Sequence, residues 1–92
     1  MNYEDFLPIV QRLPKEFTSH VFIKEYIRAH EPEYISELQP IWGGFRNLNS
    51  NIARELERHQ EYLHISKGEE KDADENIKGY ISKNAKWTRT DL

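Results

Sequence analysis

Arginine and asparagine side chains crowd the start of the segment GGFRNLNSNIARELERH, residues 43–59. Both residue types hydrogen-bond phosphate oxygens, and both can form paired hydrogen bonds to base edges in the DNA major groove. These residues are Arg46, Asn47, Asn49, Asn51, Arg54 and Arg58. Their chemistry predicts contacts to duplex DNA, whereas helix caps and an ordinary solvated helix surface are the alternative interpretation.

A second basic cluster lies near the C-terminus, where residues 76–90 contain four Lys or Arg residues and no acid. If this segment ends in a strand, Trp87 and Arg89 share one face and Lys86 and Thr88 share the other. We expect Trp87 to seat the strand on the core. Lys83, Lys86 and Arg89 are predicted to contact the DNA backbone, and ordinary surface charges are again the alternative.

Catalytic and metal-binding patterns are absent from the sequence. The chain has no cysteine, and its four histidines lack the spacing of a zinc site. Asp72, Asp74 and Asn76 alternate as in a calcium loop, but Ile77 and Lys83 occupy the positions where such a loop needs glycine and glutamate. No nucleophile has an evident base. We therefore expect no enzyme activity, no metal and no cofactor.

The bulk composition predicts one domain in residues 1–92 that holds itself together by packing. Neither a signal peptide nor a membrane span is recognisable, so we expect a cytoplasmic protein without a membrane partner. The formal net charge of −3 counts against nucleic acid. Residues 68–75 alone carry five acids and one lysine, however, so one face of the domain can still be basic.

Apolar spacing predicts four helices. An N-terminal helix is expected at residues 5–13, ended by Pro14, and a second begins after the N-cap Thr18 and runs to about residue 29. The third helix has Pro32 in its first turn and ends at Pro40, before a connection at residues 41–44 that contains Trp42 and two glycines. The fourth helix is expected at residues 46–63, with its buried face formed by Leu48, Ile52, Leu56 and Leu63.

Strand signals follow the fourth helix. Alternation begins around residues 62–66, and a returning strand is expected at residues 85–90. Between them, residues 67–76 (KGEEKDADEN) are polar and start at a glycine, which predicts a solvated loop. The fold class is thus mainly α with a small β-hairpin, an α+β arrangement.

This order of elements resembles a winged helix-turn-helix domain with an extra N-terminal helix. The resemblance covers residues 17–90, with residues 1–14 as the extra helix and residues 67–76 as an acidic wing loop. It is carried by FTSHVFIKEYI, GGFRNLNSNIARELERH and NAKWTR, the last of which is similar to the closing strand of small bacterial and phage winged-helix domains. The resemblance implies that the long helix enters the DNA major groove and that the hairpin touches the adjacent backbone.

Two functions follow as hypotheses. The first is duplex DNA binding, as a transcriptional regulator or a subunit of a DNA-acting assembly. The second is a protein interaction module on the same frame, as a homodimer or with another protein, because aromatic residues such as Tyr26, Tyr34 and Trp42 are numerous for a chain of this size. A continuous positive face joining Arg54, Arg58 and Lys86 would favour DNA over protein.

Overall fold

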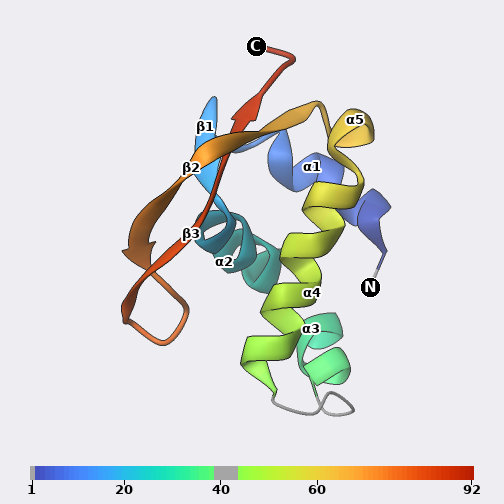
Figure 1. Cartoon of the computed structure of the whole chain (residues 1–92). Coiled ribbons are helices and arrows are strands. Elements are labelled where there is room, and N and C mark those ends of the chain that lie inside the picture. Colours follow the sequence, from blue (N-terminus) through green and yellow to red (C-terminus); the bar gives the residue numbers. More distant parts are fainter. Residues whose placement is uncertain (1, 39–43) are drawn as a thin grey trace.

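The chain folds as helices packed against one face of a small antiparallel sheet (Figure 1). The computed structural model describes residues 2–38 and 44–92, without the side chain of Phe45. The helical elements in order are η1 (Tyr3–Asp5), α1 (Phe6–Val10), α2 (Ser19–Ala29), α3 (Glu31–Leu38), α4 (Phe45–Arg58) and α5 (Gln60–Leu63). The strands are β1 (Glu16–Thr18), β2 (Ile65–Glu75) and β3 (Ile81–Arg89).

The sheet has three strands in the order β1-β3-β2, all antiparallel. The α+β class predicted from the sequence is confirmed, but the prediction of a two-stranded hairpin misses β1. The prediction of a loop at residues 67–76 is also wrong, because residues 65–75 form β2 and the turn lies at residues 76–80. Pairing with β3 supplies the backbone hydrogen bonds of β2. An exposed edge strand of this kind needs no apolar alternation, and charges on it disfavour edge-to-edge aggregation.

Helix α2 begins where the sequence predicts. The Thr18 hydroxyl accepts a hydrogen bond from the amide of Val21 at 3.2 Å, and Phe22, Ile23 and Tyr26 are buried. The N-terminal helix is shorter than the predicted 5–13, since α1 ends at Val10. Two overlapping turns follow, in which the backbone amides of residues 12 and 13 donate hydrogen bonds to the carbonyl oxygens of residues 9 and 10. These turns bring Leu13 into the core outside any helix.

Helix α4 places Leu48, Ile52 and Leu56 in the core, with exposed fractions of 1% or less, as its 3.6-residue period predicts. The predicted helix at residues 46–63 is divided, because the backbone leaves helical geometry at His59 and α5 follows. The His59 ring stacks on Tyr3 at a centroid distance of 3.7 Å, which fixes the break against η1. Of the predicted glycine connection before α4, residues 39–43, including Trp42, lie outside the described residues.

Trp87 joins the sheet to the helices. Its side chain is 1% exposed, and its indole Nε1 donates a hydrogen bond of 2.9 Å to the Ser19 hydroxyl at the start of α2. The prediction that Trp87 seats the closing strand on the core is confirmed. From Trp87 back toward the turn at residues 76–80, the hairpin of β2 and β3 projects away from the core (Figure 1).

Candidate nucleic-acid interface

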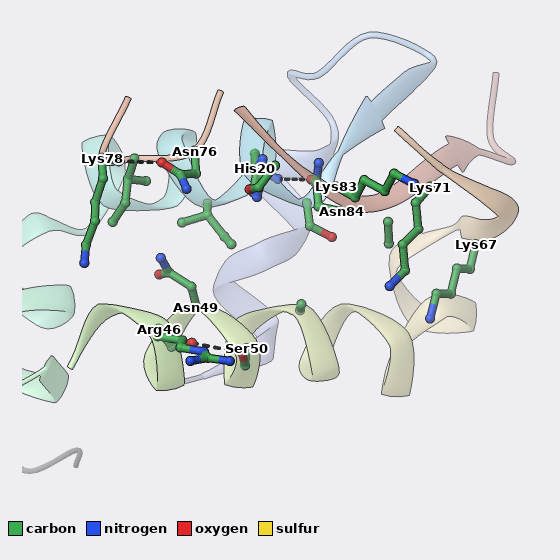
Figure 2. A pocket seen from close by; sticks show the side chains of 16 residues that line it. His20, Arg46, Asn49, Ser50, Lys67, Lys71, Asn76, Lys78, Lys83 and Asn84 are labelled. Atoms are coloured by element: carbon green, nitrogen blue, oxygen red, sulfur yellow. Dashed lines mark hydrogen bonds between the residues drawn. The ribbon is translucent and has the colours of Figure 1, made fainter. Parts of the chain in front are cut away.

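A cleft of about 710 Å³ lies between α4, the start of α2 and the β2–β3 hairpin (Figure 2). Its described lining contains five cationic side chains and neither Asp nor Glu. The cations are Arg46, Lys67, Lys71, Lys78 and Lys83. We call this the basic cleft. A concave surface lined by one sign of charge concentrates the opposite charge, so an anionic ligand fits it best.

Helix α4 contributes one stripe to the basic cleft, made of Arg46, Asn49, Ser50 and Ala53. Their spacing of three, four and seven residues is that of one helical face. The Asn49 side-chain oxygen accepts a hydrogen bond of 2.9 Å from the Tyr34 hydroxyl, which holds the Asn49 side chain in place at the cleft wall. Burial raises the pKa of Tyr34 to about 12, so this hydroxyl remains a donor at neutral pH.

The hairpin contributes lysines through its register. Lys67 lies opposite Trp87, Lys71 opposite Ala85, and Lys83 opposite Ala73. Directly opposed residues of an antiparallel pair point to the same face, so these lysines share the face of the buried Trp87. Figure 2 shows Lys67 and Lys71 at one end of the cleft, and Lys78 at the other.

A β-bulge between Lys67 and Lys71 leaves both lysines on the same face of the sheet. Three residues, 68–70, lie opposite Lys86 alone, so the ladder gains two residues and the side-chain alternation keeps its phase. Gly68 suits the bulge because a Cβ there would lie 3.2 Å from the Lys86 carbonyl oxygen. The acids of the bulge, Glu69 and Glu70, are exposed and do not line the cleft.

The outward face of the hairpin carries Asp74, which ties β2 to the start of α2. The Thr18 hydroxyl donates to Asp74 Oδ2 at 2.6 Å, and His20 Nδ1 and Asn84 Nδ2 each lie 2.7 Å from Asp74 Oδ1. The Asn84 side-chain oxygen also accepts the His20 amide at 2.7 Å. Partial burial by itself would raise the pKa of Asp74, but the hydrogen bonds from Thr18, Asn84 and His20 outweigh it and the pKa is lowered. Asp74 is outside the described cleft lining, but its partners His20 and Asn84 belong to that lining, so Asp74 fixes the hairpin at the border of the cleft.

Most of the charge in the basic cleft is not neutralised by the protein. Within residues 2–38 and 44–92, Arg46, Lys71 and Lys83 have no ion-pair partner. Lys67 is paired, its Nζ lying 3.2 Å from Glu57 Oε1 at the edge of α4. Arg46, Lys71 and Lys83 are therefore available for an external anion.

Three of the predicted DNA-contacting residues, Arg46, Asn49 and Lys83, line the basic cleft. The other predicted residues of α4 do not line it. Arg54 donates to the Asn51 side-chain oxygen at 3.2 Å, and Arg58 pairs with Glu55 at 3.2 Å. Asn47 is exposed on α4, also outside the cleft lining.

Arg89, for which the sequence predicts a DNA-backbone contact, lies inside the protein. Its side chain is 8% exposed and donates to the carbonyl oxygens of Gln11 and Leu13 at 3.2 and 2.8 Å and to Asp91 at 3.0 Å. A buried guanidinium with these partners is a structural cation, because its donors are occupied. Arg89 shares the inward face of Trp87, as the strand alternation itself indicates.

Lys86 lies on the outward face of the sheet and not in the cleft. Its Nζ is 2.8 Å from a Glu16 carboxylate oxygen, which raises the pKa of Lys86 and lowers that of Glu16. The continuous face proposed from Arg54, Arg58 and Lys86 is not the surface at which the cations gather: none of the three lines the basic cleft.

Sequence reasoning missed Lys67 and Lys71, which it placed in a loop. One partial signal was present: the two lysines are four residues apart and Glu70, Asp72 and Asp74 have the other parity, although Glu69 and Glu75 share the parity of the lysines. In a strand these two sets point to opposite faces. Assigning a strand to the acidic run would have brought both lysines to the cleft.

No group of three or more His, Cys, Asp or Glu side chains in the described part of the chain is arranged to hold a metal ion. Among the same residues, no helix combines the length and the apolar character that crossing a membrane requires. No protein-family model, curated protein sequence or solved structure matches the chain.

Proposed function

We propose that the chain is a winged helix-turn-helix protein that binds duplex DNA, with α4 as the recognition helix and the β2–β3 hairpin as the wing. The element order in the described residues supports the proposal: two short helical segments, a short strand, four helices (α2 to α5) and a hairpin, with β1 added to the sheet beside β3. In this arrangement the helix before the hairpin and the hairpin itself flank one concave surface. The basic cleft is that surface.

The observation that carries the proposal is the charge of this cleft. A chain with a formal net charge of −3 gathers five cations into one concave lining whose described residues include no carboxylate. Phosphodiester backbones are the polyanions that bind to such a surface, and each phosphate neutralised by Lys or Arg releases condensed counterions. Ser50 and Asn49 add uncharged groups suited to phosphate oxygens.

The cleft accommodates one strand of the duplex between α4 and the hairpin. One DNA strand separates the major groove from the minor groove, so a backbone held in the cleft puts α4 on the major-groove side. Arg46 and Ser50 then face the near strand. Asn47, Asn51, Arg54 and Arg58 extend from the far side of α4 toward base edges or the opposite strand, and the pairing of Arg58 with Glu55 makes it the weakest of these candidates.

Salt-dependent binding to a mixed-sequence duplex of about 20 base pairs, about two helical turns, tests the proposal. We expect the double variant Lys71→Ala/Lys83→Ala to bind more weakly. It should also reduce the slope of log K against log salt concentration by about 1.8, since each phosphate contact contributes about 0.9.

The matched control is Arg28→Ala, which removes a cation that is 78% exposed on α2 and paired with Glu25. Its affinity and salt slope should equal those of the wild type. Undetectable duplex binding by the wild type, or equal slopes for the cleft variant and the control, would reject the proposal. Arg54→Ala/Arg58→Ala tests the far side of α4 in the same titration, and an unchanged affinity would remove those two residues from the interface.

The alternative function is a protein interaction module, for which the number of aromatic residues was the argument from the sequence. Phe6, Tyr26 and Tyr34 are buried in the core, and Tyr3 stacks on His59, so these aromatic residues do not form an exposed patch. The large apolar side chains that remain exposed include Tyr62 on α5 and Ile35 on α3. Sedimentation of the pure protein, which would reveal self-association, discriminates this alternative.

A further inference from the structure

The tip of the hairpin exposes two adjacent apolar side chains. Tyr80 is 69% exposed and Ile81 is 71% exposed, and they follow one another where the turn enters β3. Single exposed apolar residues are common on protein surfaces. Two neighbours at the end of a projecting hairpin form a different feature, because both are exposed and together they make the tip of the hairpin apolar.

The turn that carries these side chains is held in one conformation. Asn76 organises it: its side-chain oxygen accepts the amides of Lys78 at 2.9 Å and Tyr80 at 3.1 Å, and its own amide donates to the Tyr80 carbonyl at 2.8 Å. Gly79 adopts φ +88°, which an L side chain rarely adopts, and its amide donates to the Asn76 carbonyl at 3.0 Å. A pre-organised turn loses little conformational entropy when it binds a partner.

The tip lies at one end of the basic cleft. Asn76, Ile77 and Lys78 of the turn belong to the cleft lining, and Figure 2 shows Asn76 and Lys78 together at that end. Lys83, two residues beyond Ile81, lines the same cleft. Along the chain the two apolar side chains thus lie between Lys78 and Lys83, cations that complement a polyanion, while across the strand pair Glu75 lies opposite Ile81.

We infer that Tyr80 and Ile81 form a wedge that enters the DNA minor groove, partly unstacks a base step and bends the duplex. The inference rests on the proposed DNA binding. A backbone strand held in the cleft has the major groove and α4 on one side, so the hairpin tip beyond it faces the minor groove. Apolar side chains that enter the minor groove separate base steps and bend DNA toward the major groove. The partner is thus a duplex that deforms on binding.

Ring closure of DNA tests the wedge without knowledge of a preferred sequence. The probe is a mixed-sequence duplex of about 120 base pairs, shorter than the persistence length of about 150 base pairs, so ligation into circles is slow unless the duplex is bent. We expect saturating wild-type protein to accelerate ring closure. Tyr80→Ser/Ile81→Ser should abolish the acceleration at saturation and weaken duplex binding about tenfold, the order expected for lost base contacts.

The matched control is Ile35→Ser, which removes an apolar side chain that is 48% exposed on α3 and outside the cleft lining. It should bind and bend DNA like the wild type. Duplex binding by the wild type with equal ring closure by the tip variant would overturn the wedge and leave the proposed function standing. Absence of duplex binding by the wild type would overturn both. Concentration-dependent self-association lost only in the tip variant, without bending, would assign the tip to a protein interface and overturn the wedge.

Discussion

Replacing Asp74 with asparagine should destabilise the fold at neutral pH by removing the charge that holds the hairpin to α2. Its carboxylate receives hydrogen bonds from Thr18, His20 and Asn84 at 2.6 to 2.7 Å. Hydrogen bonds to a charged group contribute about 1.5–3 kcal/mol each. Asparagine retains one carbonyl acceptor and the Asp74 side chain is 31% exposed, so we expect a total loss of about 1–2 kcal/mol.

The pH dependence follows from the lowered pKa of Asp74. Because its pKa is lower in the folded than in the unfolded chain, the folded chain binds fewer protons at this site. The stabilisation is complete above the unfolded value of about 3.9 and is lost as the pH falls through the folded value. The stability difference between the wild type and Asp74→Asn should therefore be largest near neutral pH and shrink progressively below about pH 4.

Urea unfolding followed by far-ultraviolet circular dichroism measures this difference at each pH. With a slope of about 1–1.5 kcal/mol per molar urea, the midpoint should fall by about 1–2 M at pH 7. Asp72→Asn is the matched control on the same strand, because among the described residues its carboxylate accepts a hydrogen bond only from the adjacent amide of Ala73. An Asp74→Asn effect that is independent of pH, or equal to that of Asp72→Asn, would refute the assignment of Asp74 as the anchor of the hairpin.

Two further predictions concern residues that support the site from a distance. Arg89→Met should destabilise the fold by about 2–4 kcal/mol in urea unfolding, because the carbonyls of Gln11 and Leu13 lose their buried donor; equal stability would show that Arg89 is not structural. Gly79→Ala should lower stability by only about 1–2 kcal/mol, since φ +88° strains an L residue, yet it should also reduce ring closure by disturbing the tip; unchanged bending would show that the turn conformation is dispensable.

The sequence predicts those parts of the fold that depend on local chemistry. Thr18 is a good N-cap with an apolar stripe behind it, and α2 starts directly after it. Leu48, Ile52 and Leu56 repeat with the helical period, and α4 buries them. Trp87 among cations is identified as the inward residue of its strand. In each case neighbours within about two helical turns carry the signal.

Elements that form by pairing with residues far along the chain are not predicted by local sequence patterns. Strand β1 has three residues, too few for a periodic pattern, and exists because it pairs with β3 about 70 residues later, Phe17 lying opposite Trp87. Strand β2 is exposed at nearly every position after Ile65, so no apolar alternation marks it. The contact between His20 and Asp74 joins residues 54 positions apart. The basic cleft is equally hard to predict, because three of its five cations, Lys67, Lys71 and Lys83, lie on strands that are defined by their pairing.

Strand parity explains how an acidic segment can build a basic surface. The run of residues 68–75 has a net charge of −4, and as a loop it would repel phosphate. As a strand in the observed register, it points Lys71 toward α4 and directs Asp72 and Asp74 to the other face, where Asp74 anchors the hairpin. Glu75 shares the side of Lys71 but lies opposite Ile81, outside the described cleft lining. A shift of one residue would exchange the two sets and put both carboxylates in the cleft. The bulge at Gly68 adds an even number of residues to the ladder. It is therefore as important as the lysines themselves for the positive charge of the cleft lining.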